Sequence, residues 1–323
     1  MIYSLLRWIV GIALYWFYRD IRIVGKERIP HDGPLLIAVN HQNALIDSLV
    51  VSWLAPRRVA MTAKATLAAN PFIALLFKAL HVVPLRRAND EASKGDKPLD
   101  RSRNAEAFRE IVSILEHGGA VLIFPEGKSH NESGLEPLKT GLARLALQAR
   151  DSNHVAGLRI LPLGLVFEDK GTPGSVVDAC IGQPIEMDTW SGTDYDKLTD
   201  EVANRLRSVS ENAELSPSEL RVSGVNPHTV RERLVSLAAW WGRLTHQVPV
   251  RMARNIAVRR SRSADEPAML TILFGVALVL MTYAIHLTLV GLIAHSFLID
   301  CLYLASLVSG AYWAAFQQHP RRY

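Results

Sequence analysis

The two residues of this chain that are best suited to acid–base chemistry are His41 and Asp47, which are six positions apart. His41 follows the apolar run 34–39, which predicts a buried strand, and Asp47 lies in the apolar stretch 44–54, which predicts a helix. The carboxyl end of a strand is where an α/β sheet places its reactive groups. Asp47 is near enough to hold one imidazole nitrogen while the other faces a substrate hydroxyl, as a general base requires. Taken alone, the pair fits a buried or capping histidine better.

Three further segments place polar residues beside short apolar strands. Residues 124–129 read Phe-Pro-Glu-Gly-Lys-Ser, residues 82–87 read Val-Val-Pro-Leu-Arg-Arg, and residues 159–165 read Arg-Ile-Leu-Pro-Leu-Gly-Leu. Together with Asn40, His41 and Asp47, these segments resemble the four motifs of the glycerolipid acyltransferase family, in order and in spacing. That family includes lysophosphatidate and glycerol-3-phosphate acyltransferases. The resemblance covers roughly residues 20–210.

The resemblance implies acyl transfer and a role for the first two motifs. His41 is the expected base for the acceptor hydroxyl and Asp47 its orienting partner, as in a catalytic triad whose serine is replaced by the substrate hydroxyl. Arg86 and Arg87 supply donors suited to phosphate, and Arg87 is the preferred phosphate ligand. Asn40 is interpreted as a structural residue.

The third motif and the segment after it supply the remaining candidate substrate-binding residues. We expect Glu126 to bind the glycerol hydroxyl or to order nearby arginines, and Gly127 to offer its backbone N–H to the ligand. Lys128 and Ser129 add donors. Lys139 stands near the start of a helix predicted at 138–149, whose N-terminus can help to hold an anion. Four other histidines are interpreted as non-catalytic, because none has a carboxylate at comparable spacing: His81, His117, His130 and His154.

The sequence departs from the common family pattern at two points. Five residues separate His41 from Asp47 where four are usual, and this resembles a branch near the glycerol-3-phosphate and dihydroxyacetone-phosphate acyltransferases. The segment 171–177 lacks the arginines that relatives often carry there. We expect transfer of an acyl group from acyl-CoA or acyl carrier protein to 1-acylglycerol-3-phosphate, which gives phosphatidate for phospholipid synthesis. The alternatives are another phosphorylated glycerol or lysophospholipid acceptor and, from a different class, a non-catalytic membrane-anchored lipid-binding protein.

Composition and charge limit the partners and cofactors. The 323 residues are 49% hydrophobic and carry a net charge of +5, which favours an anionic partner. No nucleic-acid motif accompanies this charge, so membrane lipid is expected as the partner and nucleic acid is not. Two cysteines, Cys180 and Cys301, imply no disulfide framework. The sequence has no zinc-site spacing, Walker-type loop or serine-hydrolase elbow, so we expect no metal and no cofactor beyond the acyl thioester.

The predicted elements indicate an α/β fold with a mixed, partly parallel sheet flanked by helices, in an acyltransferase domain at 20–215. The expected strands are 21–24, 35–39, 59–62, 81–85, 120–124, 160–167 and 176–181. The expected helices are 44–54, 71–80, 103–117, 138–149 and 195–211. Residues 88–101 form a charged insert, interpreted as a solvated loop or as a mobile lid.

Apolar segments at both ends of the chain predict membrane contact. Residues 1–19 predict a helix in the membrane interface, with a single span as the alternative, because the segment is short and rich in aromatic residues. Residues 216–266 are expected to form a linker and a basic amphipathic region with an amphipathic helix at 230–244. This helix is expected to present its apolar side through leucines that include Leu237 and Leu244.

The C-terminal residues 267–318 predict a transmembrane hairpin of two helices, near 269–290 and 295–316. The alternative is a buried helical pair in a soluble protein. Lys and Arg flank the pair at both ends, so we expect both ends on the cytoplasmic side. The chain is therefore expected to be an integral membrane protein with its catalytic domain on the cytoplasmic face.

Overall fold

The computed structural model describes residues 2–65, 82–85, 104–130, 134–172, 174–211, 230–261 and 266–316. The contacts within the chain divide it into two compact units. The helical unit contains residues 1–22, 167–177 and 214–323, and the α/β unit contains residues 23–166 and 178–213. The N-terminal segment and the C-terminal helices, which lie far apart in the sequence, therefore belong to the same unit.

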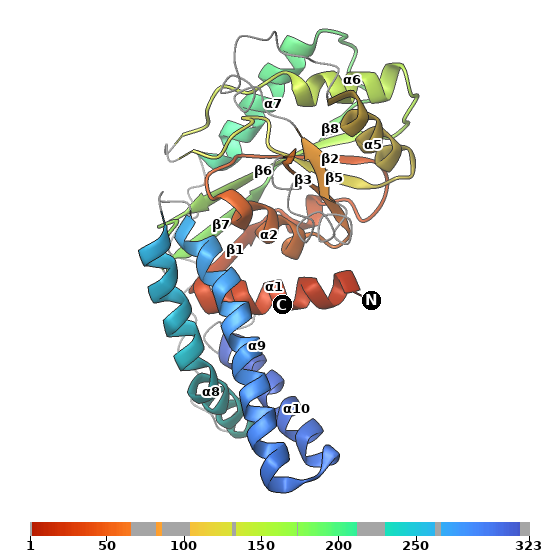
Figure 1. The fold of residues 1–323 in the computed structure, drawn as a ribbon. Helices are drawn as coiled ribbons and strands as arrows, with labels where there is room; N and C mark the ends of the chain where they lie inside the picture. The colour runs from red at the N-terminus through yellow and green to blue at the C-terminus, as the bar shows by residue number, and fades with distance from the viewer. Residues whose placement is uncertain are drawn as a thin grey trace, which may run out of the picture. The chain divides into compact units, whose positions relative to one another are not determined.

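The α/β unit is built on a mixed, mostly parallel sheet of eight strands in the described part of the chain. The strand order is β1–β7–β6–β2–β5–β3–β4, and β8 pairs antiparallel with β6 (Figure 1). The pairs β2–β5, β2–β6, β3–β5 and β3–β4 are all parallel. The expected fold class is therefore confirmed. The strands are β1 (Asp20–Val24), β2 (Leu35–Val39), β3 (Val59–Lys64), β4 (Val82–Leu85), β5 (Ala120–Ile123), β6 (Arg159–Phe167), β7 (Val176–Ile181) and β8 (Ile185–Glu186).

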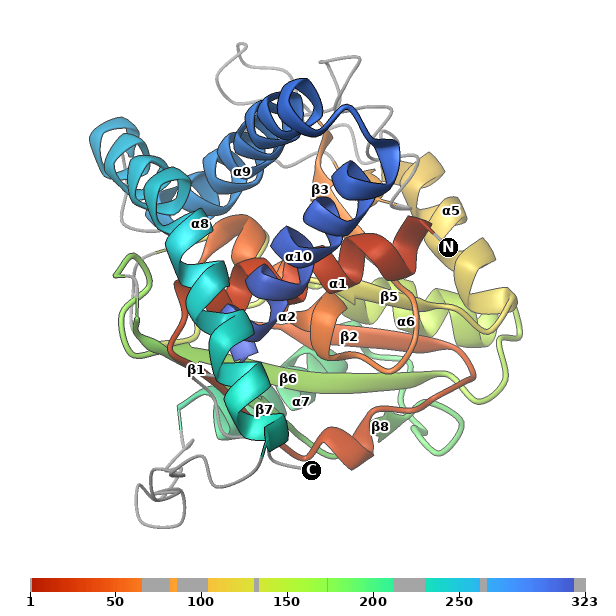
Figure 2. The ribbon, with the colours of Figure 1, turned by 90° about the horizontal axis from the view of Figure 1, so that it is seen from below.

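Helices cover both faces of this sheet. The helices α5 (Ala105–Glu116), α6 (Gly141–Asp151) and α7 (Tyr195–Ser210) lie on one face, and α2 (Ala44–Leu54) lies on the other (Figure 1, Figure 2). Every residue of β2 and β5 is buried, because central parallel strands covered by helices expose neither side. Such strands read as continuous apolar runs, which is why they were predictable from the sequence.

The pairing of β2 with β5 brings the first and third motifs together. Leu35 is opposite Ala120 and Ala38 is opposite Ile123, so the two strands run in register to the same edge of the sheet. The segment that carries His41 and the segment that begins at Phe124 therefore leave the sheet side by side. This placement follows the general rule that the carboxyl ends of parallel strands carry the reactive groups of an α/β fold.

Where the structure describes them, the predicted strands and helices of the α/β unit are present and differ from the prediction only at their ends. The helix predicted from residue 138 begins at Gly141, because the backbone N–H of Lys139 donates to the carbonyl of Pro125 and ties that segment to the third motif. The two-residue strand β8 was not predicted, since its length leaves no periodicity to detect. The predicted helix 71–80, the insert 88–101 and the linker 216–227 lie outside the described residues.

The helical unit packs four helices together: α1 (Ile2–Phe17), α8 (Val230–Arg260), α9 (Glu266–Ala294) and α10 (Phe297–Phe316). Helix α8 lies along both α9 and α10, and α1 contacts α9 and α10. Trp16 at the end of α1 donates its indole N–H to the carbonyl of Ala311 at 3.3 Å, and Arg254 of α8 donates to the carbonyl of Trp16 at 2.8 Å. These bonds fix α1 to the C-terminal helices.

Helix α8 is longer than predicted. It does not end at residue 244 but continues to Arg260, and Pro249 lies inside it. Leu237 and Leu244, which were expected on the apolar side of this amphipathic helix, are exposed, and the buried side of α8 carries small residues such as Ala253 and Ala257. Small side chains let α8 approach its neighbours closely.

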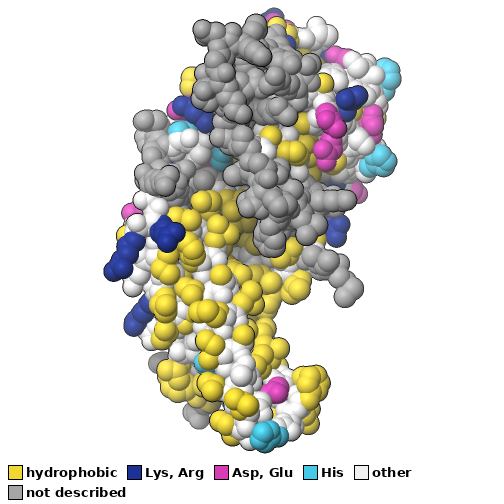
Figure 3. Space-filling model, viewed as in Figure 1, with side chains coloured by type: hydrophobic (Ala, Val, Ile, Leu, Met, Phe, Trp, Pro, Cys, Tyr) yellow, Lys and Arg dark blue, Asp and Glu magenta, His cyan; other side chains and the backbone are white. Residues whose placement is uncertain are grey.

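The helices α9 and α10 are long and apolar enough to cross a membrane. Only 17% of the most apolar window of α9 and 22% of that of α10 is buried, which is far too little for a core pair in a soluble protein. Figure 3 shows hydrophobic side chains over most of the visible surface of these two helices. The two helices of the expected hairpin are therefore present, with α9 a few residues longer at each end than predicted.

Two glycines set the closest contact between α8 and α10. A Cβ added to Gly242 would lie 1.9 Å from the carbonyl oxygen of Gly310, so neither residue tolerates a side chain without movement of the backbone. We expect Gly242→Ala to destabilise the helical unit by about 1–3 kcal/mol, the usual cost of overpacking. The measurement is thermal unfolding of the detergent-solubilised protein.

The matched control for this change is Gly275→Ala in α9. A Cβ at Gly275 would meet its nearest neighbour, the Cβ of Ala253, at 3.9 Å, an ordinary van der Waals contact. This variant should unfold at or slightly above the temperature of the parent protein, because alanine favours the helix over glycine. Equal unfolding temperatures for the two variants would contradict the close approach of α8 and α10.

Candidate active site

The imidazole of His41 and the carboxylate of Asp47 form a buried pair at the edge of the sheet. His41 follows β2, and Asp47 lies in the first turn of α2. The Nδ1 atom of His41 lies 2.9 Å from Oδ2 of Asp47, and both side chains are almost fully buried. The same carboxylate oxygen accepts the backbone N–H of Asn43 at 2.8 Å, which holds the turn between β2 and α2.

This contact determines which nitrogen of His41 can act as a base. An ionised carboxylate only accepts hydrogen bonds, so Nδ1 must carry the proton that Asp47 binds. In a neutral imidazole the lone pair then lies on Nε2, which is the nitrogen available to take a proton from a hydroxyl. The ring is also held by Phe124, which stacks on it with centroids 3.8 Å apart and planes 13° from parallel. The side chain is thus fixed by one hydrogen bond and one aromatic contact.

The carboxylate of Glu126 ties the first motif to the third. Its Oε1 accepts the backbone N–H of His41 at 2.6 Å, and its Oε2 accepts the backbone N–H of Glu136 at 2.9 Å. The side chain is fully buried. We expected Glu126 to bind substrate or to order arginines, and the structure instead shows both of its oxygens bound to the protein itself. Glu126 therefore positions the backbone on which His41 stands.

His130 has a carboxylate partner that was not expected from the sequence. It was set aside for want of a nearby carboxylate, yet its Nε2 contacts Oε2 of Glu126, four residues earlier. Its backbone N–H also donates to the carbonyl of His41 at 3.1 Å. The spacing of four residues was visible in the sequence, but it signals a contact only on a helix, and this segment is a loop. His130 thus joins the network around His41.

Asn40 has the structural role that we expected. Its amide nitrogen donates to the carbonyl of Leu165 at 2.8 Å, and its amide oxygen accepts the N–H of Leu165 at 2.7 Å. Both ends of the side chain are therefore used to join the end of β2 to β6. This leaves the Asn40 amide in no position to stabilise an oxyanion.

We expected Gly127 to offer its backbone N–H to a ligand, and in this structure that N–H has a partner within the protein. That N–H donates to the carbonyl of Phe124 at 3.1 Å and closes the turn after β5. The residue adopts φ of 78°, a left-handed conformation that other residues rarely adopt, so glycine is required here for the turn. Its neighbour Lys128 forms an ion pair with Glu136 at 3.0 Å on the half-exposed side of the same turn.

A cavity of about 320 Å³ opens beside the third motif. Four of the candidate binding residues line it: Glu126, Gly127, Lys128 and Lys139. Apolar side chains also line it, among them Phe108, Ile111, Ile123, Leu142 and Leu145. Phe124, whose ring stacks on His41, also lines the cavity, so a bound molecule would lie against the support of the proposed base.

Three further candidate binding residues, Ser129, Arg86 and Arg87, are not among the described residues that line the cavity. Ser129 lies in the turn after Lys128, outside the lining of the cavity. Arg86 and Arg87 lie outside the described residues, and the structure describes the preceding strand β4 only up to Leu85, which lines the same cavity. Among the described residues no group of three histidine, cysteine or acidic side chains could hold a metal ion. The described site thus consists of the His41–Asp47 pair, the Glu126–His130 network and the cavity.

Replacing Glu126 by glutamine tests the network. One oxygen of the carboxylate becomes an NH2 group, which cannot accept, so either His41 or Glu136 loses the acceptor of its buried N–H. We expect Glu126→Gln to destabilise the α/β unit by about 1–3 kcal/mol, the cost of an unsatisfied buried group. Thermal unfolding measures the loss, at about 2–4 °C for each kcal/mol in a domain of this size.

The control is Glu136→Gln, which removes the carboxylate that pairs with the half-exposed Lys128. An ion pair of this kind contributes at most about 1 kcal/mol, so this variant should unfold within about 4 °C of the parent protein. If Glu126→Gln unfolded no earlier than Glu136→Gln, the buried carboxylate would not hold the loop as described.

Comparison with known proteins agrees with this geometry. Residues 20–166 match the family described as Acyltransferase. The chain is similar to glycerol-3-phosphate O-acyltransferase 2 of Saccharomyces cerevisiae, with 33% identity over 125 residues that cover 36% of this chain and 17% of that protein. It is also similar to a 1-acyl-sn-glycerol-3-phosphate acyltransferase of Limnanthes douglasii, with 28% identity over 143 residues that cover 44% of this chain and 46% of that protein. The aligned region spans less than half the length of either relative.

The fold is shared with a solved structure. The crystal structure of the 1-acyl-sn-glycerophosphate acyltransferase of Thermotoga maritima matches with a TM-score of 0.50 and 22% identity, covering 69% of this chain and 81% of that chain. At this identity the likeness establishes the fold and not the activity. The family match and the relatives agree with the motifs and their geometry: residues 20–166 carry an Acyltransferase domain, which is similar to the domains of glycerolipid acyltransferases.

Proposed function

We propose that this protein transfers a fatty acyl group from a thioester, acyl-CoA or acyl carrier protein, to a hydroxyl of 1-acylglycerol-3-phosphate. The observation that carries the proposal is the buried His41–Asp47 pair, with Nδ1 and Oδ2 2.9 Å apart, beside a cavity lined by apolar side chains and by Lys128 and Lys139. Together they offer a general base, apolar surface for an acyl chain and cations for a phosphate, all of which this reaction uses. The product is phosphatidate, which feeds phospholipid synthesis.

The reaction needs no nucleophile from the protein. Nε2 of His41 takes the proton of the acceptor hydroxyl as the hydroxyl oxygen attacks the carbonyl carbon of the thioester. The tetrahedral intermediate then collapses, the C–S bond breaks, and the leaving thiolate takes the proton back from the imidazolium. Asp47 remains ionised throughout and stabilises the imidazolium, as the aspartate of a catalytic triad does. The products are an ester and a free thiol.

The acceptor is proposed from the chemistry of the cavity walls. Lys128 and Lys139 supply positive charge for a phosphate, and the apolar side chains of the lining suit the acyl chain that lysophosphatidate carries and glycerol-3-phosphate lacks. We assign Arg87, with Arg86 beside it, as a further phosphate ligand on the basis of the second motif. Relatives are named for each of the two acceptors, so glycerol-3-phosphate is the next candidate.

The protein is proposed to act at a membrane, with α9 and α10 as a transmembrane hairpin. Their length and their exposed apolar surface support this location. Exposed arginines on α8, namely Arg251, Arg259 and Arg260, precede the hairpin and favour the cytoplasmic side for that end of it. The catalytic domain is proposed to face the cytoplasm as well.

The base is tested by His41→Ala. We expect acyl transfer from a radiolabelled thioester to fall by at least about a hundredfold, the usual contribution of a positioned base. Asp47→Asn should have a smaller effect, because it disturbs the orientation of the base without removing it. His117→Ala, which changes an exposed histidine on α5's C-terminal side, should keep normal activity. Turnover near the normal rate in His41→Ala, with thermal unfolding unchanged, would refute the assignment.

The phosphate ligand is tested by Arg87→Ala. We expect the KM for the phosphorylated acceptor to rise about ten- to a hundredfold, because loss of a charge-assisted hydrogen bond costs about 1.5–3 kcal/mol. The KM for the acyl donor should change little. The control is Arg109→Ala, which removes one positive charge from an exposed position on α5. It should change neither the KM for the acceptor nor the KM for the acyl donor. An equal rise in both constants for Arg87→Ala would indicate a structural arginine.

A further inference from the structure

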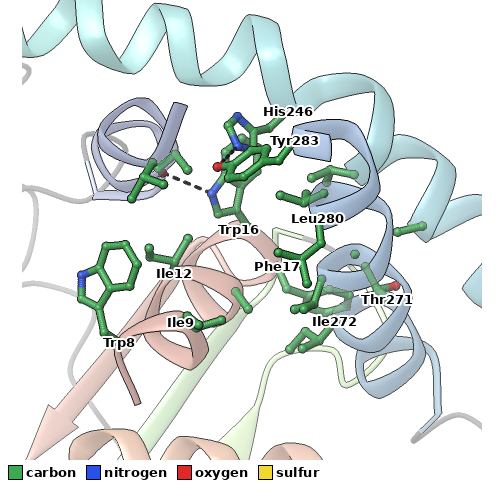
Figure 4. Close-up of a pocket in the computed structure, with 18 of the residues that line it drawn as sticks. Trp8, Ile9, Ile12, Trp16, Phe17, His246, Thr271, Ile272, Leu280 and Tyr283 are labelled. Atoms are coloured by element: carbon green, nitrogen blue, oxygen red, sulfur yellow. Dashed lines mark hydrogen bonds between the residues drawn. The ribbon is translucent and has the colours of Figure 1, made fainter. Parts of the chain in front are cut away.

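The helical unit contains a second and larger cavity. It has a volume of about 450 Å³ and is enclosed by helices α1, α8, α9 and α10. Figure 4 shows Ile9 and Ile12 of α1 on one side of this hollow and Ile272 and Leu280 of α9 on the other. We call it the helical groove. All the residues that line it belong to the helical unit.

Three polar side chains that border the helical groove, those of Trp16, His246 and Tyr283, are hydrogen-bonded within the protein. His246 bonds Tyr283 through Nε2 at 2.7 Å and the carbonyl of Gly242 through Nδ1 at 2.8 Å (Figure 4). The indole N–H of Trp16 is bound to a backbone carbonyl of α10. A water molecule needs two to four polar partners to occupy a buried site, and this wall offers few. The occupant that the wall fits is apolar.

The rim of the helical groove is continuous with the apolar exterior of the helices. Leu5 and Trp8 of α1, with Val276, Leu280 and Leu304, line the groove and are also exposed. In water this rim would be unfavourable, but in a bilayer it opens directly to hydrocarbon, from which an acyl chain can enter sideways. From Thr271 to Tyr283 the groove runs for about 18 Å along α9 at 1.5 Å per residue, close to the roughly 15 Å thickness of one leaflet.

Among the described residues that line the helical groove, Arg254 is the cation. Arg254 is half-buried, donates one guanidinium bond to the carbonyl of Trp16, and has a buried Nε with no partner in the described part of the chain. Arg251, Arg259 and Arg260 lie on the same helix and are exposed. A basic group at a groove that is otherwise apolar matches the two parts of an anionic phospholipid.

We propose that the helical groove is a binding site for one acyl chain of an anionic bilayer phospholipid, whose phosphate is met by Arg254. The lipid is a structural ligand that fills the space between α1 and the C-terminal helices, and it is distinct from the substrate in the α/β unit. The inference rests on the proposed membrane location. A bound acyl chain would explain why these helices leave a cavity of about 450 Å³ between them although α8 and α10 approach closely at Gly242 and Gly310.

The experiment uses the full chain in nanodiscs of phosphatidylglycerol, a small fraction of which carries a photoreactive diazirine in its acyl chain. After illumination, peptides are mapped by mass spectrometry. We expect adducts on residues 5–17 and 271–283 in excess of those on the outward positions Ile285, Leu289 and Ile293 of α9. Adducts that follow surface exposure alone, or crosslinked dimers in place of lipid adducts, would overturn the proposal.

Two pairs of variants sharpen the test. Gly275→Phe fills the groove and should reduce labelling of residues 5–17 about tenfold, which corresponds to about 1.4 kcal/mol of affinity. Leu289→Phe, on the exposed side of α9, should leave the labelling unchanged. If Gly275→Phe does not elute as a single species in size-exclusion chromatography, Val279→Trp is used in its place. Arg254→Gln should abolish any preference for phosphatidylglycerol over phosphatidylcholine, and Arg259→Gln should retain it. Labelling that is unaffected by the groove-filling change would refute the site.

The same samples distinguish this inference from the proposed function. His41→Ala should be labelled normally while it loses acyl transfer, because His41 belongs to the other unit. Normal acyl transfer without labelling of the groove would refute the lipid site alone. Normal labelling without any acyl transfer by the parent protein would refute the proposed function alone.

Discussion

The catalytic geometry of this protein depends on one buried carboxylate, that of Glu126. Parallel pairing of β2 and β5 brings two loops to the same edge of the sheet, but it does not fix their conformations. Glu126 does so by accepting the backbone N–H groups of His41 and Glu136 and by contacting His130. A charge buried this deeply is tolerated only when its acceptor sites are filled, so the loops are held together or the whole arrangement is lost.

The chemistry of His41 follows from that support. With its backbone held by Glu126, its ring is directed by Asp47 at Nδ1 and by the face of Phe124. Phe124 also borders the cavity, so the side chain that stacks on the proposed base forms part of the cavity wall. Glu126 therefore supports the backbone of the proposed base, and Lys128 and Lys139 are cations among the described residues that line the cavity.

The sequence predicted the features that depend on local patterns. Buried parallel strands read as apolar runs, so β2, β5 and the end of β2 at which His41 stands were all predicted. The roles of Glu126, Gly127 and His130 were not, because each depends on partners from a loop or strand whose approach only the tertiary structure defines. For α8 the sequence indicated an amphipathic helix but not its full length, nor that small residues form the side that packs against α9 and α10.

The most direct test of the account is the tautomer of His41. The protein, labelled with ¹⁵N at histidine and reconstituted at a pH where the ring is neutral, is measured by NMR, and the signals of His41 are identified by their absence from a His41→Gln sample. Donation to Asp47 requires the proton on Nδ1, with Nε2 showing the shift of an unprotonated nitrogen. A proton on Nε2 of the neutral ring would mean that this nitrogen cannot accept the proton of a substrate hydroxyl, and it would contradict the proposed mechanism.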